Sequence, residues 1–157
     1  MLKYLNTQVT FAEVPDEITL CINITGCKNG CKNCHSSYLA QDIGTELTFN
    51  EVRKLIKKNS GISCIALMGG DAEPDKINTL ASFIINHCGS IKVAWYSGRQ
   101  ELNNNIDLCN FDYIKLGPYK EEFGPLNSRT TNQRFYKVNG KELVDITNKF
   151  WKHETEN

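Results

Sequence analysis

Apolar residues in this chain are concentrated in four short runs, at residues 18–24, 64–68, 91–96 and 111–116. Each run is only five to seven residues long and is followed by glycine or another turn-forming residue. Short apolar runs with such boundaries are typical of buried strands. The sequence therefore predicts four buried strands in the central part of the chain.

The segments between these runs have the periodicity of helices. Thr48 and Glu51 form a capping box ahead of an amphipathic helix that we expect at 49–59. Pro74 opens a second helix, with an apolar stripe at Ile77, Leu80, Ala81, Ile84 and Ile85. Alternating strands and helices predict an α/β fold with a mostly parallel sheet and helices on its outer face.

The remaining segments carry weaker signals. We expect a leading strand or loop within 1–17, a short helix at 36–41, a polar helix around 100–105 and an irregular loop at 119–131. Asn139-Gly140 lies between two strand-like stretches, 134–138 and 141–144, which predicts a hairpin. A helical turn or two at 146–152 completes the expected order.

Composition narrows the class of protein. A chain of 157 residues predicts a single domain, 1–157, that can bury a core. The formal net charge is zero, with 18 basic and 18 acidic side chains, which argues against a strongly basic nucleic-acid-binding surface. No apolar run approaches the roughly 20 residues of a membrane span, and the first residues do not resemble a signal peptide. We therefore expect a cytoplasmic protein that uses its seven cysteines for metal binding rather than for disulfides.

Three cysteines, Cys27, Cys31 and Cys34, follow the first predicted strand with the spacing C-x3-C-x2-C. Thiolates are the usual ligands of iron–sulfur clusters, and three of them leave one iron of a cubane open to another molecule. A closed zinc site that adds Cys21 is an alternative, although the gap between Cys21 and Cys27 fits zinc spacing poorly. A disulfide is the least favoured interpretation.

Two further candidate sites follow the second and third strands. Gly69-Gly70 offers a backbone that a ligand can approach closely, and Asp71 adds a carboxylate suited to an ammonium group. A branched side chain at Gly70 is therefore expected to obstruct a ligand. Ser97-Gly98 ends the third strand. Because ligands of parallel α/β sheets gather at the carboxyl ends of the strands, we expect these segments to meet the cysteine loop there.

The cysteine motif resembles that of the radical S-adenosylmethionine (SAM) enzymes. Cys34-His35-Ser36 is similar to the Cys-His-Asn of glycyl-radical-enzyme activases. The short length, the Gly-Gly-Asp and the stretches Gly-Pro-Leu-Asn (124–127) and Thr-Thr-Asn-Gln-Arg-Phe-Tyr (130–136) most resemble the activating proteins of anaerobic ribonucleoside-triphosphate reductase.

This resemblance implies a partial, open βα barrel of the radical SAM type and a particular set of site residues. Cys27, Cys31 and Cys34 would hold a [4Fe–4S] cluster. The segment Gly69, Gly70 and Asp71 would contact the amino group of SAM, with Glu73 as the alternative acid. Further contacts would come from Asn33 and His35 near the adenine and from Ser97 near the ribose or carboxylate. For His35 the alternative is an exposed loop histidine, and for Ser97 it is a helix N-cap.

The implied activity is that of an oxidoreductase. SAM would be cleaved reductively to a 5′-deoxyadenosyl radical, which would generate a glycyl radical on the partner, an anaerobic ribonucleoside-triphosphate reductase. A reduced flavodoxin- or ferredoxin-type protein would supply the electron. Another radical SAM activase, a small-molecule radical SAM enzyme and a zinc-stabilised binding module remain alternatives.

For several other residues we expect either a role in packing or a role in binding the partner protein. Cys64, Cys88 and Cys109 are predicted to be buried and inert. The loop at 117–134 carries Tyr119, Phe123 and Arg129, residue types that anchor protein interfaces. Either this loop contacts the partner protein or its aromatic residues cover the core.

Overall fold

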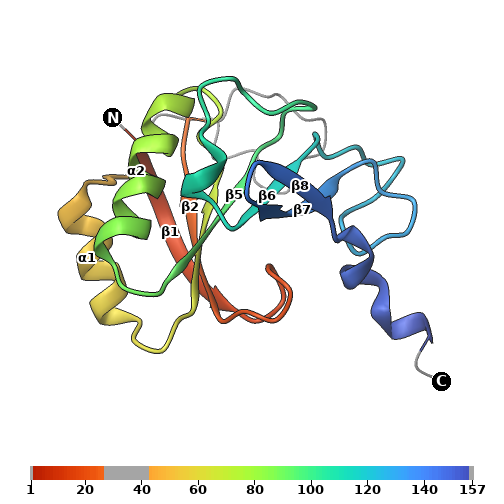
Figure 1. Ribbon diagram of the computed structural model, residues 1–157, viewed down its shortest axis with the longest axis horizontal. Helices are drawn as coiled ribbons and strands as arrows, with labels where there is room; N and C mark the ends of the chain where they lie inside the picture. The colour runs from red at the N-terminus through yellow and green to blue at the C-terminus, as the bar shows by residue number, and fades with distance from the viewer. Residues whose placement is uncertain (1, 27–42, 156–157) are drawn as a thin grey trace.

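The computed structural model describes residues 2–26 and 43–155. Within these ranges the chain forms one mixed sheet in the order β3-β1-β2-β4-β5-β6-β7-β8, two α-helices and two 3₁₀ segments (Figure 1). The strands are β1 (Lys3–Thr10), β2 (Thr19–Ile24), β3 (Thr45–Glu46), β4 (Cys64–Met68), β5 (Lys92–Tyr96), β6 (Tyr113–Leu116), β7 (Arg134–Asn139) and β8 (Glu142–Asp145). The helical segments are α1 (Phe49–Lys58), α2 (Pro74–His87), η2 (Leu108–Asn110) and η3 (Thr147–Thr155).

The four apolar runs form the centre of the sheet, as the sequence predicts. Strands β2, β4, β5 and β6 lie side by side and parallel. The flanking strands β1, β3, β7 and β8 pair antiparallel, so the sheet is mixed rather than mostly parallel. The reason lies in the connections. A parallel neighbour needs a crossover, whereas β1 joins β2 through a short turn and β7 joins β8 through a hairpin.

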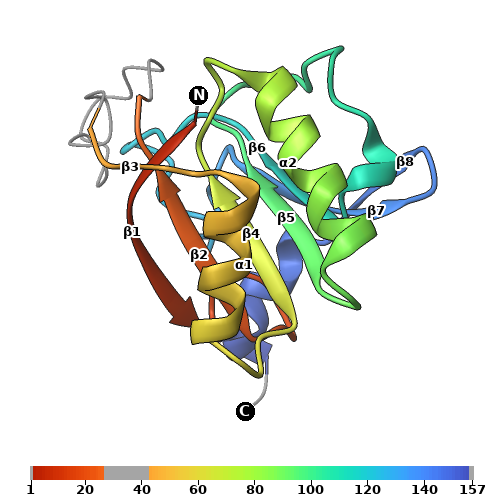
Figure 2. The ribbon, with the colours of Figure 1, turned by 90° about the vertical axis from the view of Figure 1, so that its left-hand side faces the viewer.

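Both helices cover the same face of the sheet (Figure 2). Thr48 caps α1 by accepting a hydrogen bond from the Glu51 backbone N–H at 3.1 Å, which confirms the predicted N-terminus. The apolar stripe of α2 is buried at Ile77, Leu80, Ala81 and Ile84. These side chains pack on Leu20, Ile22, Ile65 and Leu67 from β2 and β4, in the larger of two apolar clusters.

The opposite face of the sheet carries the smaller cluster. Alternate residues of the strands point to it, including Cys21 on β2, Cys64 on β4, Tyr96 on β5 and Phe135 on β7. The fully buried Val14 joins them from the turn after β1. The turn at 11–18 therefore covers the half of this face near the amino ends of the parallel strands. We call this face the inner face.

The leading segment forms strand β1, one of the two expected alternatives. Two other expectations need correction. No helix forms at 100–105; the Asn103 side-chain oxygen accepts a hydrogen bond from the Asn105 N–H at 2.8 Å, and such local bonds compete with helix formation. The hairpin turn lies one residue later than predicted, because Asn139 pairs with Glu142 and leaves Gly140 and Lys141 in the turn. Gly140 has φ = 66°, the conformation that a two-residue hairpin needs at its first central position.

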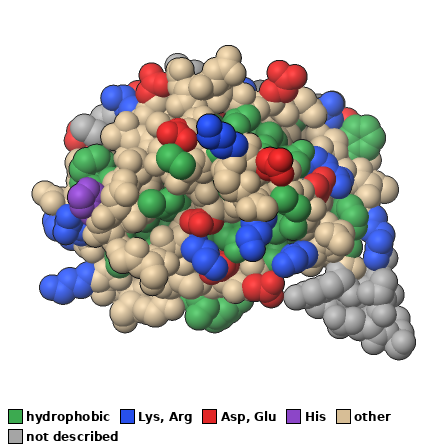
Figure 3. Space-filling view, viewed as in Figure 1, with side chains coloured by type: hydrophobic (Ala, Val, Ile, Leu, Met, Phe, Trp, Pro, Cys, Tyr) green, Lys and Arg blue, Asp and Glu red, His purple; other side chains and the backbone are tan. Residues whose placement is uncertain are grey.

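The irregular loop at 119–131 and the helical turns near the C-terminus are confirmed, the latter as η3. The helix expected at 36–41 lies outside the described residues. Among the residues that are described, no helix is long and apolar enough to cross a bilayer. Acidic and basic side chains are intermixed on the face shown in Figure 3, in line with the zero net charge.

Candidate site at the carboxyl edge of the parallel strands

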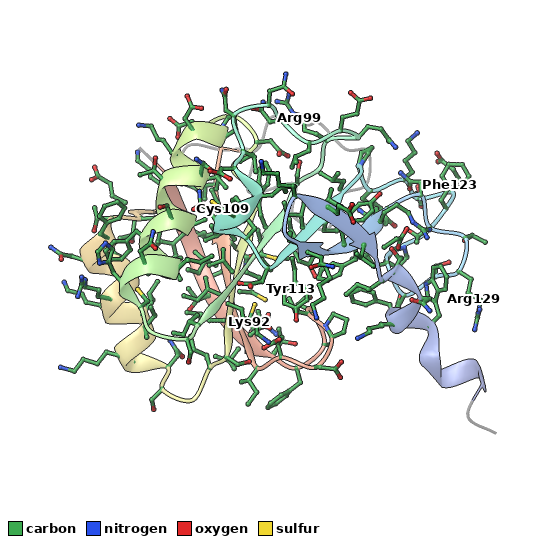
Figure 4. The ribbon with its side chains drawn as sticks, viewed as in Figure 1. Lys92, Arg99, Cys109, Tyr113, Phe123 and Arg129 are labelled. Atoms are coloured by element: carbon green, nitrogen blue, oxygen red, sulfur yellow. The ribbon has the colours of Figure 1, made fainter. Side chains whose placement is uncertain are left out.

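The carboxyl ends of the four parallel strands meet at one edge of the sheet. Hydrogen bonds continue beyond the strands, from the Gly69 N–H to the Tyr96 carbonyl at 3.0 Å and from the Ser97 N–H to the Lys115 carbonyl at 2.9 Å. The Gly117 N–H donates to the Arg99 carbonyl at 2.7 Å. The segments after β4, β5 and β6 are thus tied together. We call this edge the carboxyl edge; Arg99 lies along it at the top of Figure 4.

The cysteine segment leaves the described chain at this edge. Cys27, Cys31, Cys34, Asn33 and His35 lie outside the described residues. Its two flanks are described. The Thr25 N–H donates to the Lys3 carbonyl at 2.9 Å, and the Thr25 hydroxyl donates to the Ile43 carbonyl at 2.6 Å. Residues 25 and 43 therefore hold the start and the end of the cysteine segment together beside the end of β2.

Gly69 and Gly70 both have positive φ, 113° and 89°. A Cβ atom on Gly70 would lie 2.5 Å from Cδ1 of Ile77, inside the apolar contact between this turn and α2. A Cβ atom on Gly69 would lie 3.3 Å from the Ile24 carbonyl oxygen, at the end of β2. Gly70 is thus required by packing against α2, while Gly69 faces the neighbouring strand end. The Gly69 carbonyl is held by the indole N–H of Trp95 at 2.7 Å.

Asp71 and Ser97 come together as the sequence suggested. The Ser97 hydroxyl donates to Oδ1 of Asp71 at 2.6 Å, and the Gly98 N–H donates to Oδ2 at 2.8 Å. Both Asp71 and Ser97 are buried. The carboxylate therefore joins the turn after β4 to the turn after β5 and shapes the carboxyl edge.

The structure also shows the surroundings of Ser97 and Glu73, for which the sequence left alternative roles open. Ser97 is not a helix N-cap, because no helix follows it; its oxygen instead accepts a hydrogen bond from the Arg99 N–H at 3.1 Å. Glu73 occupies the N-cap position of α2 without a side-chain capping bond and is half-buried. The two acids thus differ in setting: Asp71 is built into the edge, and Glu73 stands at the start of a helix.

Lys115 is a residue of this edge that the sequence analysis left unassigned. Its side chain is buried on the inner face, donates to the Gly117 carbonyl at 3.0 Å and lies 5.8 Å from the centre of the Tyr96 ring. A lysine inside the otherwise apolar strand β6 was the signal that could have pointed to it. It brings a positive charge to the end of β6.

A second cluster of polar side chains lies near the amino ends of the parallel strands. The buried carboxylate of Glu17 accepts hydrogen bonds from Lys92 at 2.8 Å, Tyr113 at 2.8 Å and Ser63 at 2.7 Å (Figure 4). Burial opposes ionisation of Glu17, but these hydrogen bonds outweigh it and lower its pKa. Because each of these three hydrogen-bond donors belongs to the fold itself, we infer that the cluster stabilises the structure and does not bind a ligand.

The described cysteines are all free thiols. Cys64 is buried, as predicted, and Cys88 is half-buried. Cys109 is exposed, which corrects the prediction; it lies in the short η2 turn, where Asn110 is the buried residue instead. Cys21 is buried in the middle of β2 on the inner face, and burial raises the pKa of its thiol to about 12. The position of Cys21 within the strand, before the cysteine segment begins, is the feature that disfavours it as the fourth ligand of a closed zinc site.

The loop between β6 and β7 is anchored to the C-terminal segment. Arg129 donates to the Trp151 carbonyl at 3.3 Å and lies 5.7 Å from the centre of its ring. The Trp151 indole N–H donates to the Leu126 carbonyl at 2.9 Å. Phe123, on the same loop, is 41% exposed. Figure 4 labels it together with Arg129. Arg129 thus ties the loop to the C-terminal segment, whereas Phe123 is exposed to solvent.

Within the described parts of the chain, no three His, Cys, Asp or Glu side chains come together as a metal site. The cysteine segment itself is the part of the sequence with metal-binding spacing, and it joins the fold at the carboxyl edge. Comparisons of the chain with models of protein families, with curated proteins and with solved structures gave no match.

Proposed function

We propose that this protein is a radical SAM activating enzyme for anaerobic ribonucleoside-triphosphate reductase, built as a partial, open βα barrel. The observation that carries the proposal is the meeting of two features at one edge of the sheet. The C-x3-C-x2-C segment departs from the end of β2, and the Gly69-Gly70-Asp71 turn and Ser97 follow the ends of the adjacent parallel strands. Ligands of such sheets bind at this edge.

The residues present fit the two implied groups. Three cysteines on one segment match the thiolate ligands of a cluster with one open iron. Gly69 has no side chain beside the end of β2, and the hydrogen bonds of Asp71 and Ser97 pre-form the neighbouring turns. Cys27, Cys31 and Cys34 would hold the cluster. When bound, the cluster and SAM would supply a 5′-deoxyadenosyl radical able to take a hydrogen atom from a glycine of the reductase.

The protein's own part in this proposal is binding, orientation and exclusion of water. The hydrogen bonds between the turns after β4, β5 and β6 keep the carboxyl edge rigid. The turn at 11–18 and the smaller apolar cluster fill the inner face toward the other end of the strands. Substrate would therefore enter at the carboxyl edge, which suits a protein segment that must present one glycine.

The test is anaerobic reconstitution of the full chain followed by assays in two stages. With dithionite, the reconstituted protein should convert SAM to methionine and 5′-deoxyadenosine. With an anaerobic ribonucleotide reductase from the same genome, electron paramagnetic resonance should show a glycyl radical doublet. Cleavage of SAM without any glycyl radical would favour another radical SAM activity. A colourless protein that holds zinc and no iron would favour the binding-module alternative and overturn the proposal.

A further inference from the structure

The chain returns to the carboxyl edge at the start of β7. Leu116, the last residue of β6, pairs antiparallel with Arg134, the first residue of β7. Gln133 therefore lies opposite Gly117, just beyond the ladder. The two residues are in contact, because a Cβ atom on Gly117 would lie 3.2 Å from Cα and 3.7 Å from Cγ of Gln133. Asn132 and Gln133 thus belong to the same edge as the turns after β4 and β5.

The carboxamide side chains of these two residues have unused hydrogen-bonding groups. The side-chain oxygen of Asn132 is buried and has no hydrogen-bond partner among the described residues, while the nitrogen of the same amide donates to the Pro118 carbonyl at 3.0 Å. Gln133 is only 7% exposed, and its side chain makes no hydrogen bond within the part of the chain that the structure describes. Its backbone N–H donates to the Thr131 hydroxyl at 3.1 Å. Buried polar groups are nearly always paired, so two neighbouring exceptions indicate a function.

The side chain of Gln133 points to the inner face of the sheet. Residues two apart on an extended chain point to the same side, and Phe135 lies in the apolar cluster of the inner face. Lys115, opposite Phe135 on β6, is buried on that face as well. The turn at 11–18 covers the half of this face near the amino ends of the parallel strands. Gln133 lies at the other half, where the proposed function brings the substrate in.

We propose that Asn132 and Gln133 bind the main chain of the reductase segment that carries the target glycine, an inference that rests on the proposed function. A glycine has no side chain, so its backbone N–H and C=O are the polar groups by which it can be recognised. A carboxamide offers one acceptor oxygen and two N–H donors. It can therefore accept from the N–H and donate to the C=O of one extended residue, as a neighbouring strand does.

Pairing with a group from another molecule accounts for both unused amides. An unpaired buried amide lowers the stability of the free protein, and such a cost is retained where the group serves binding. Gln133 keeps a small exposed fraction at the carboxyl edge. Because side-chain rotamer changes are common when proteins bind, both amides can turn toward a segment that enters there.

The test compares the wild type with Gln133→Met, which keeps the length of the side chain and removes its amide, after anaerobic reconstitution. Because this amide has no partner in the free chain, urea unfolding should show equal or higher stability for the variant. The SAM affinity measured by calorimetry, and SAM cleavage with dithionite alone, should be unchanged. Binding to the full-length reductase, measured by interferometry, and the initial rate of glycyl radical formation should each fall by about tenfold, as expected for one or two lost hydrogen bonds.

Asn132→Leu is the second variant, because it deletes the unpaired oxygen within nearly the same side-chain shape. It should weaken binding to the reductase by about tenfold as well. Its stability should fall slightly, since the bond to Pro118 is also lost. Asn86→Leu is the matched control: it makes the same substitution at an exposed position of α2, on the other side of the sheet, and should bind the reductase as the wild type does.

Three results would overturn the proposal. A lower free energy of unfolding for Gln133→Met would give its amide a structural role. Weaker SAM binding by this variant would show that the amide contacts SAM instead. Wild-type binding to the reductase by both variants would exclude the pair from recognition. A wild type that cleaves SAM but forms no glycyl radical removes the proposed function itself, and this inference with it, before any variant is compared.

Discussion

The hydroxyl of Ser97 donates a 2.6 Å hydrogen bond to the carboxylate of Asp71, across two neighbouring strand ends that are 26 residues apart in the chain. The other oxygen of that carboxylate accepts from the Gly98 N–H. Two residues that the sequence suggested as separate ligand contacts thus form one structural unit. If SAM binds at the carboxyl edge, Asp71 would act on it partly by holding the turn after β5 in place.

Replacement of Asp71 should therefore affect folding as well as binding. Asp71→Ala leaves the buried Ser97 hydroxyl and the half-buried Gly98 N–H without their acceptor, and we expect a loss of about 1–3 kcal/mol in the free energy of unfolding by urea. Ser97→Ala removes one donor and leaves the Gly98 bond, so it should cost less, about 1 kcal/mol. Calorimetry on reconstituted protein should show weaker SAM binding for Asp71→Ala. Equal stability of Asp71→Ala and wild type would contradict the structural role of this pair.

Gly70 provides a test of packing rather than of ligand access. Its φ of 89° and the 2.5 Å approach of a Cβ atom to Cδ1 of Ile77 predict that Gly70→Ala combines backbone strain, about 1–2 kcal/mol, with overpacking of about 1–3 kcal/mol. Gly89→Ala is the matched control, because Gly89 has φ = 73° and open space around the new Cβ. It should show the strain alone. The Gly70→Val variant would therefore report on folding, and Gly69→Ala is the better probe of ligand approach.

A double-mutant cycle isolates the packing contribution. Ile77→Ala deletes both Cδ1 and Cγ1, which lie 2.5 Å and 2.7 Å from the position of the new methyl group. The Gly70→Ala change should then cost less in the Ile77→Ala background, by about 0.5 kcal/mol or more. If Gly70→Ala and Gly89→Ala destabilise equally in every background, contact with α2 is not what requires glycine at position 70.

The cysteines divide into predicted ligands and buried thiols. Cys27→Ala, Cys31→Ala and Cys34→Ala should each lose the brown iron–sulfur absorbance near about 400 nm, or leave it incomplete, and abolish SAM cleavage. Cys21→Ala should keep its iron, because that thiol is buried in mid-strand with a pKa of about 12. Cys64→Ala serves as a second buried control. Loss of iron from Cys21→Ala as complete as from Cys31→Ala would refute the three-ligand hypothesis.

Glu17 should make stability depend on acidity. Its pKa is lowered in the folded protein from the usual 4.5, so its contribution is present above about pH 4.5 and is lost as the pH falls through the folded value. We expect Glu17→Gln to lower the melting temperature at pH 7, since Lys92 and Tyr113 lose a charged acceptor. The difference from wild type should shrink toward pH 3. A difference that is constant between pH 7 and pH 3 would show that the charge of Glu17 is not what stabilises this end of the sheet.

Two residues of the loop between β6 and β7 are expected to differ in role, one in binding the reductase and the other in holding the fold. Phe123→Ser removes an exposed aromatic side chain and should weaken binding to the reductase in a pull-down or by interferometry, while SAM cleavage by dithionite-reduced protein is unchanged. Arg129→Ala should instead loosen the C-terminal segment, because Arg129 holds Trp151. Proteolysis near residue 151 would report that change. Unaltered binding of Phe123→Ser to the reductase would leave the loop with a structural role alone.

Local patterns in the sequence determined the four central strands and the two α-helices. Apolar runs predicted β2, β4, β5 and β6, and the Thr48 capping box located the start of α1, because these signals depend on neighbouring residues alone. The C-x3-C-x2-C spacing likewise carries its metal-binding chemistry without any knowledge of the fold. The failure at 100–105 is also local, since asparagine side chains compete with helical hydrogen bonds there.

Contacts between distant segments were decided only by the tertiary structure. The antiparallel flanks depend on where the chain returns, and no periodicity within β1 or β7 states which strand each will pair with. Gly70 looked like an approach route for a ligand until its contact with Ile77 showed a packing requirement. Asp71 and Ser97 were expected at the same edge as ligand contacts, and only the parallel pairing of β4 and β5 showed that they hydrogen-bond to each other. The physical reason is common to all three: burial and hydrogen bonding at these positions come from residues brought close by the sheet, which the linear pattern does not encode.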